Sequence, residues 1–217
     1  MSFHYSPKIV TDGLVFYLDA ANSRSYPGSG TSWIDLGKNK TNGLLTNGPT
    51  FDSSNGGSIL FDGLDDYVDW STNPLSSLSI ITYDCWFKAS GTGHSFFTIS
   101  SSNFRVYYQN VGAPAIGWYF AFSGQNIYFN YSYNTNWTNI VYSYDGSTHL
   151  CYINGVSYSF IPGSGTSSQS NLRISGRSTA STLNLNGNIA STKIYNRAFT
   201  SSEILQNYNA TKTRFGL

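Results

Sequence analysis

The acidic side chains are the groups of this chain best suited to chemistry, and four of the eleven acidic residues fall in or beside one turn. The segment Asp62-Gly-Leu-Asp-Asp66 carries three carboxyl groups, and Asp69 follows it. Calcium is a hard cation that binds several carboxylate and carbonyl oxygens, so Asp62, Asp65 and Asp66 form a candidate calcium site. Their spacing departs from the twelve-residue helix-loop-helix calcium motif. The alternative is an Asx-type turn, in which Asp side chains accept hydrogen bonds from nearby N–H groups.

The distribution of ionisable residues argues against catalysis. Retaining hydrolysis of a glycosidic bond needs two carboxyl groups about 5 Å apart across the sugar. Glu203 is the one glutamate and sits in a helix-capping sequence, and no Asp-x-Asp or Glu-x-Asp-x-x-Glu strand occurs. The histidines, His4, His94 and His149, lack the spacing to cysteine or acidic residues that is typical of a triad or a zinc site. We therefore predict no catalytic residues, and a glucan hydrolase is the least favoured alternative.

Three segments with alternating residue types indicate a binding surface instead. In residues 104–108, 118–122 and 127–131 one phase is expected to face a core: Phe104, Val106, Tyr108, Trp118, Phe120, Phe122, Ile127, Phe129 and Tyr131. The opposite phase is expected to point outward: Arg105, Tyr107, Gln109, Tyr119, Tyr128 and Asn130. Rings beside amide and guanidinium donors can stack on sugars and pair with their hydroxyls, so these six residues are the predicted carbohydrate-binding set. The alternatives are contact with another protein and plain surface tyrosines.

The positions of these residues depend on β-strands. Turn-forming residues that recur along the chain indicate where these strands begin and end. Between Trp137 and Phe160, Asp145-Gly146 and Asn154-Gly155 separate runs rich in Tyr, Val and Ile, a pattern typical of two hairpins. Such a ribbon cannot bury its own apolar side, so other strands must supply a partner sheet. They are predicted at 13–19, 58–63, 67–70, 78–88, 95–100, 104–109, 117–123, 126–133, 171–175 and 187–195. This pattern predicts an all-β fold, an antiparallel two-sheet jelly-roll sandwich.

One short helix is predicted near the C-terminus. Thr200-Ser-Ser-Glu203 is a capping box, in which the Thr hydroxyl and the Glu carboxylate bind free N–H groups of the first turn. The helix is expected over 200–209, after an N-terminal arm at 1–12 and before a C-terminal tail at 210–217. We expect a single domain over 1–217, since β-sandwiches of this length have one core.

Composition limits the partners and the compartment. Twelve Lys and Arg balance eleven Asp and Glu without a basic cluster, so no nucleic-acid partner is predicted. A run of about 18 apolar residues and a signal peptide are both missing from the sequence, so neither membrane insertion nor export is predicted. Cys85 and Cys151 lie in apolar strands, either as buried thiols or as a disulfide.

Segments spread over most of the chain resemble the laminin-G-like, concanavalin A-like jelly-roll family. They are Phe61-Asp-Gly-Leu-Asp-Asp-Tyr-Val68, Cys85-Trp-Phe-Lys88, Trp137 to Val156, Leu172-Arg-Ile-Ser-Gly176 and Gly187 to Ile204, in the order that the family has them. The resemblance implies a concanavalin A-like sandwich. It also implies binding of glycans or protein surfaces, often beside a calcium ion, while some relatives hydrolyse glucans.

The ends of the chain resemble a narrower group. Ser6 to Asn22, Ser25 to Trp33 and Tyr208 to Leu217 are similar to the version of the domain in structural proteins of tailed, notably marine, bacteriophages. This implies a protein of the virion surface that decorates the head or acts as an accessory. The alternative is the receptor-binding tip of a tail fibre. The implied partners are other virion structural proteins, host cell-surface glycans and further copies of the chain.

Overall fold

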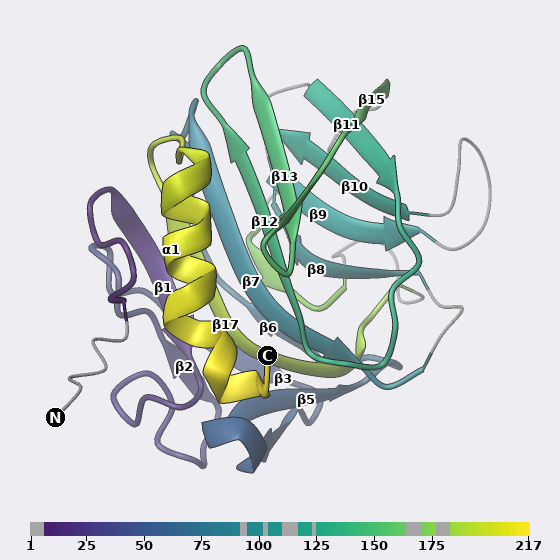
Figure 1. Ribbon diagram of the computed structural model, residues 1–217. Helices are drawn as coiled ribbons and strands as arrows, with labels where there is room; N and C mark the ends of the chain where they lie inside the picture. Colours follow the sequence, from purple (N-terminus) through teal and green to yellow (C-terminus); the bar gives the residue numbers. More distant parts are fainter. Residues whose placement is uncertain are drawn as a thin grey trace, which may run out of the picture.

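Two antiparallel β-sheets packed face to face form the body of the protein (Figure 1). The computed structural model describes residues 7–91, 95–101, 104–109, 117–122, 125–163, 171–176 and 183–217. The predicted all-β sandwich with a short C-terminal helix is confirmed. Among the described residues, no helix combines the length and the apolar character that crossing a membrane requires.

The first sheet contains the predicted meander. Its order is β14 (Val156–Tyr158), β13 (His149–Ile153), β12 (Thr138–Tyr144), β7 (Ile81–Ala89), β17 (Asn186–Tyr195), β5 (Ser58–Asp62) and β4 (Thr50–Asp52), and β1 (Leu14–Asp19) also pairs with β17. The hairpin turns have the backbone conformation that their residue types favour. Gly146, Asn154 and Gly155 all have positive φ, at 104°, 49° and 76°.

The second sheet carries the alternating segments side by side. Its order is β15 (Ile161–Gly163), β11 (Gln125–Asn130), β10 (Gly117–Phe122), β9 (Phe104–Gln109), β8 (Phe96–Ser100), β16 (Arg173–Ile174), β6 (Tyr67–Asp69), β3 (Asn42–Thr46) and β2 (Ser32–Ile34). A short 3₁₀ helix, η1 (Ser54–Gly56), lies between β4 and β5. The adjacency of β9, β10 and β11 is what brings the predicted outward residues onto one surface.

The core fills the space between the two sheets. The predicted inward residues of β9, β10 and β11 are all buried there, and Tyr131, which follows β11, is half-buried against the core. Cys85 and Cys151 are buried free thiols on strands that β12 separates. Burial raises the pKa of Cys85 to about 11. The disulfide alternative is therefore not found.

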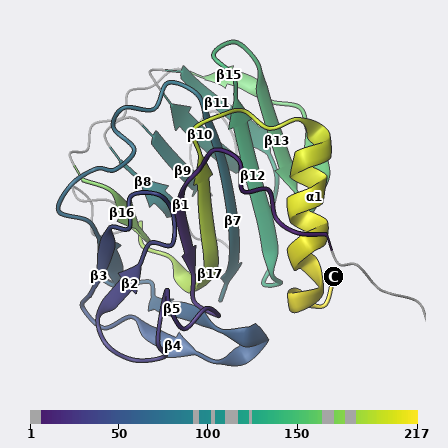
Figure 2. The same cartoon turned by 90° about the vertical axis from the view of Figure 1, so that its left-hand side faces the viewer.

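The C-terminal segment packs on the outer face of the first sheet (Figure 2). The helix α1 (Ser201–Thr211) runs beyond the expected end at residue 209, and a 3₁₀ helix, η2 (Lys212–Phe215), continues it. The expected tail at 210–217 is therefore largely ordered structure. The physical reason is apolar contact, because Phe215 is 7% exposed and stacks on Trp86 with ring centroids 4.1 Å apart.

Glu203 fixes the start of α1, and its substitution gives a pH-dependent prediction. Its carboxylate accepts hydrogen bonds from Arg197 Nη2 at 2.6 Å and from the Thr200 backbone N–H at 2.9 Å. The Arg197 bond is the main cause that lowers the Glu203 pKa from 4.5 to about 2. Because these groups are partly exposed, we expect Glu203→Gln to cost about 1 kcal/mol at pH 7.

The sign of the pH dependence follows from the lowered pKa. A carboxylate whose pKa is lower in the folded state contributes its stability above the ordinary pKa near 4.5 and loses it as the pH falls towards 2. Urea unfolding of both proteins between pH 7 and pH 2.5 should therefore show the gap between them closing below about pH 4.5. A gap that stays constant over this range would contradict the prediction.

Candidate functional site

Three tyrosines of the predicted set lie in one row across adjacent strands of the second sheet. Tyr119 on β10 is directly opposite Tyr107 on β9 and Tyr128 on β11. Its ring centroid is 4.9 Å from that of Tyr107 and 5.3 Å from that of Tyr128, with interplanar angles of 19° and 16°. Cross-strand aromatic pairs of this kind stabilise a sheet. We call Tyr107, Tyr119 and Tyr128 the tyrosine ladder.

Stacking within the ladder limits what each ring can offer to a ligand. Tyr119 is 8% exposed because its neighbours cover both faces of its ring. Tyr107 and Tyr128 are half-buried. Beyond Tyr128 the next residue in the row is Ile161 of β15, which is 46% exposed. Tyr107 and Tyr128, at the two ends of the ladder, are therefore more accessible to a ligand than Tyr119 at its centre.

Polar groups flank the ladder on the same face. The Arg105 guanidinium carbon lies 5.4 Å from the centroid of the Tyr107 ring. Gln109 and Asn130 are both directly opposite Gly117, so no side chain separates these two residues along their row. Arg105 and Gln109 are half-buried and Asn130 is exposed. The structure thus brings all six predicted residues onto one face of three adjacent strands.

The two sheets differ in what covers their outer faces. The outer face of the first sheet is buried beneath α1 and η2, through contacts of Ile204, Tyr208 and Phe215. Within the part of the chain that the structure describes, no helix lies on the outer face of β9, β10 and β11. The ladder therefore belongs to the sheet face that the described chain leaves without a helical layer.

The acidic turn connects the two sheets. Asp62 ends β5 of the first sheet, and Asp66 directly precedes β6 of the second. One carboxylate oxygen each from Asp62, Asp65 and Asp66 lies within 4.8 Å of the other two. Bonds of the Asx type are also present, since Asp62 Oδ1 accepts a hydrogen bond from the Leu64 N–H at 2.8 Å. The structure thus brings the predicted metal-ligating residues together and gives the turn local bonds as well.

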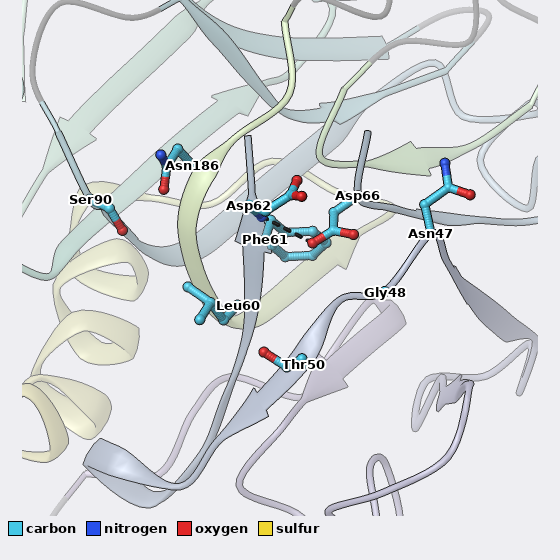
Figure 3. A pocket seen from close by; sticks show the side chains of 9 residues that line it. All are labelled: Asn47, Gly48, Thr50, Leu60, Phe61, Asp62, Asp66, Ser90 and Asn186. Atoms are coloured by element: carbon cyan, nitrogen blue, oxygen red, sulfur yellow. Dashed lines mark hydrogen bonds between the residues drawn. The ribbon is translucent and has the colours of Figure 1, made fainter. Parts of the chain in front are cut away.

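A pocket of about 370 Å³ lies beside this turn (Figure 3). Asp62 and Asp66 line it together with residues from distant parts of the sequence: Asn47, Gly48, Thr50, Leu60, Phe61, Ser90 and Asn186. Sequence reasoning missed these seven residues, because no spacing pattern indicates which loops meet the β5–β6 turn. The Gly48-Pro49 turn signal marks a loop there but says nothing about its neighbours.

The remaining candidates for catalysis do not form a triad among the described residues. His149 Nδ1 lies 3.0 Å from the Tyr142 hydroxyl, and its ring stacks on that of Tyr144. Burial lowers the His149 pKa. His4 and His94 lie outside the described residues. Three carboxyl groups lie together in the acidic turn, which is one five-residue segment and includes the buried Asp66.

Solved structures of low sequence identity share this fold. Domain 4 of an extracellular arabinanase from Geobacillus stearothermophilus, in complex with arabinotriose, matches 93% of this chain and 100% of that chain, with a TM-score of 0.66 and 15% identity. The receptor-binding domain of a botulinum neurotoxin C/D mosaic serotype matches 92% of this chain and 51% of that one, with a TM-score of 0.61 and 14% identity. A Trypanosoma rangeli sialidase in complex with sialic acid matches with a TM-score of 0.64 and 13% identity.

The extent of these matches differs. The sialidase match covers 97% of this chain. It covers only 36% of the sialidase, so this chain spans about a third of that protein's length. No curated protein matches the sequence. The family described as the concanavalin A-like lectin/glucanases superfamily matches residues 61–205, which include the acidic turn, β6 and every strand of the ladder. The chain therefore belongs to the concanavalin A-like lectin/glucanases superfamily.

Proposed function

We propose that the protein is a non-catalytic carbohydrate-binding module and that the tyrosine ladder and its polar flanks form the binding face. The observation that supports this most is the single row of stacked tyrosines on the face of the second sheet over which the described residues place no helix. An aromatic row with amides and a guanidinium beside it can hold the apolar faces of sugar rings and pair with their hydroxyls.

The flanking groups favour a sugar over a protein surface. Arg105, Gln109 and Asn130 supply hydrogen-bonding groups on both sides of the ladder rather than the apolar centre that protein interfaces bury. Among the described residues, an exposed large apolar side chain in the row of the ladder is Ile161, beyond Tyr128. The same fold carries an arabinotriose ligand in the arabinanase domain. Contact with another protein is the second function, and it would use the same face.

The proposed location is the surface of a tailed-phage virion. The resemblance of residues 6–22, 25–33 and 208–217 to segments of phage structural proteins supports it. On the head the protein would decorate or reinforce the capsid, and on a tail appendage it would bind host glycans. Cryo-electron microscopy of the source particle distinguishes these positions: density for this fold on the head lattice supports decoration, and density on the tail supports the appendage. The absence of such density from both the head and the tail would contradict a virion role.

Tyr128→Ala tests the binding face. We expect saturable binding to a glycan identified on an array of bacterial polysaccharides, with Kd raised about tenfold in this variant, because a half-buried ring at one end of the ladder is removed. Tyr67→Ala is the matched control, since Tyr67 lies on β6 of the same sheet outside the ladder and contacts Arg173. Equal Kd values for the wild type and Tyr128→Ala, or equal losses in both variants, would overturn the assignment.

The alternative function is a glycoside hydrolase, because the acidic turn places carboxyl groups close together. An enzyme of this kind would release reducing ends from a polysaccharide, and Asp66→Asn would abolish the release. The geometry argues against it, because retaining enzymes place two carboxyl groups on either side of the sugar, whereas here three converge on one point from one turn. We expect no release of reducing ends from a broad polysaccharide panel.

A further inference from the structure

A buried lysine and a buried asparagine share one carboxylate oxygen beneath α1. Lys193 on β17 and Asp84 on β7 are directly opposite each other on neighbouring strands, and Asn207 lies on α1. Asn207 Nδ2 donates a hydrogen bond to Asp84 Oδ2 at 2.9 Å, and Lys193 Nζ lies 3.6 Å from the same oxygen. Each of the three residues is 1% exposed. An amine, a primary amide and a carboxylate therefore meet at one point away from water.

The Lys193 ammonium group has fewer partners than a buried cation needs. Its Nζ has no hydrogen-bond partner in the part of the chain that the structure describes. The centroid of the Tyr17 ring lies 5.8 Å from it, and its contact with Asp84 is longer than a hydrogen bond. Buried polar atoms are nearly always paired, and a buried charge is costly. A reaction that turns this amine into an amide would remove the charge and leave a single N–H to be paired.

The carbonyl group of the Asn207 side chain is polarised by a backbone donor. Its Oδ1 accepts a hydrogen bond from the Val10 backbone N–H at 2.8 Å. Its Nδ2 donates a second bond, to the Tyr195 hydroxyl at 3.0 Å, so hydrogen bonds to both ends of the amide fix its orientation. A backbone N–H aimed at a carbonyl oxygen stabilises the negative charge that develops when a nucleophile attacks the carbonyl carbon. The network thus supplies a nucleophile, an acid–base group and an oxyanion donor.

We propose that Lys193 and Asn207 form an intramolecular isopeptide bond, with Asp84 moving the protons. Asp84 accepts one proton from the Lys193 ammonium group, and the resulting amine attacks Asn207 Cγ. The Nζ–Cγ bond forms and the Cγ–Nδ2 bond breaks, and Nδ2 leaves as ammonia after it takes a second Nζ proton through Asp84. The products are a neutral amide, ammonia and a protonated Asp84 carboxyl group, so atoms and charge balance without a further reactant. The reaction removes both buried charges, whose desolvation is costly.

A second amide also binds Asp84, and the geometry favours Asn207 over it. Asn139 Nδ2 donates to the other carboxylate oxygen, Asp84 Oδ1, at 2.8 Å. The Asn139 Oδ1 is buried without a hydrogen-bond partner among the described residues, so no donor polarises its carbonyl. Asn139 also lies on β12, which β7 separates from β17. The bond to Asn207 would tie α1 to β17 at one residue, while the helical hydrogen bonds on either side of it could still open.

Mass spectrometry of the full chain tests the proposal, on protein that is purified in the folded state and then denatured. The wild type should have lost about 17 Da, the mass of one ammonia. Tryptic digestion should give residues 178–197 joined to residues 198–212, because trypsin does not cleave after an acylated lysine. Lys193→Met, Asn207→Ala and Asp84→Asn should each keep the full mass, since each removes one reacting group.

Asn188→Ala is the matched control. Asn188 is another buried amide of the first sheet, on the same strand as Lys193, and its Nδ2 binds Asp52 and Ser58 instead of Asp84. This variant, once circular dichroism shows that it is folded, should lose one ammonia as the wild type does. A folded control that keeps the full mass would overturn the assignment to Asn207.

The wild type alone can overturn the proposal, so the test does not depend on the folding of a variant. Full mass, with residues 178–193 and 198–212 recovered as separate peptides, overturns it. A loss of about 18 Da, one water, would place the bond on the Asp84 carboxyl group and overturns it too. So does a joined peptide that contains Asn139 in place of residues 198–212. The tyrosine ladder lies on the second sheet, so each of these results leaves the glycan assignment to its own test.

Discussion

Asp84→Ala should lower the free energy of unfolding by about 3–5 kcal/mol, because it leaves a buried ammonium group without its counter-charge. Asp84 on β7 and Lys193 on β17 are neighbours in the first sheet, each 1% exposed, with Lys193 Nζ 3.6 Å from Asp84 Oδ2. The two Asp84 oxygens also accept hydrogen bonds from the side-chain amides of Asn139 at 2.8 Å and Asn207 at 2.9 Å. The substitution removes the counter-charge of Lys193 and one acceptor from each amide, while Asn139 Nδ2 keeps its bond to the Cys85 carbonyl and Asn207 Nδ2 keeps its bond to the Tyr195 hydroxyl.

A comparison with an exposed ion pair separates the effect of burial on the free energy of unfolding from the effect of charge. Asp12→Ala removes an ion pair with Arg197 in which the Asp12 side chain is 84% exposed, so it should cost less than about 1 kcal/mol. The double variant Asp84→Leu with Lys193→Met should cost less than Asp84→Ala alone, because no unpaired charge stays buried. Urea unfolding at pH 7 measures all three. A loss below about 1 kcal/mol in Asp84→Ala would contradict this account.

The local elements of the fold could be predicted because their signals are local. Asn154-Gly155 tolerates positive φ, and Thr200 with Glu203 forms the capping box that the sequence indicated. The alternation correctly predicted which residues of β9, β10 and β11 enter the core, but β10 is buried on both faces, so Tyr119 is not a surface residue. The end of the C-terminal helix could not be read in the same way, because the contact of Phe215 with Trp86 joins residues more than a hundred positions apart.

The candidate site was predictable in its residue types but not in its geometry. Strand phase identifies which tyrosines point outward, whereas the stacking that covers Tyr119 depends on the register between three strands. Likewise, the acidic turn was visible in the sequence, but the buried Asp66 Oδ1 and the Asn184 amide that binds the Leu64 carbonyl were not. The period of the sequence pattern indicates to which face of the sheet a side chain points. The register between paired strands decides which side chains lie beside it.

Trp86→Ala should cost about 3–5 kcal/mol and should release the C-terminal segment from the first sheet. Trp86 on β7 is fully buried, and its ring stacks on Phe215 at 4.1 Å and on Tyr208 at 5.9 Å between centroids. Its Nε1 donates a hydrogen bond to Thr211 Oγ1 at 2.9 Å. The Trp86 side chain thus contacts both α1 and η2, so its removal takes away the packing contacts that hold both helices on the first sheet.

Trp86→Phe separates the stacking from the hydrogen bond. It keeps an aromatic ring beneath Phe215 and loses the bond to Thr211, so it should cost about 1–2 kcal/mol and leave the segment docked. Hydrogen exchange of the backbone amides of residues 201–215 reports docking directly, because an undocked helix of this length is marginal in water. Faster exchange of these amides relative to those of β12 is expected in Trp86→Ala and not in Trp86→Phe. Uniform acceleration over both elements would mean that the helix unfolds with the sandwich, and that it is not a separable layer on it.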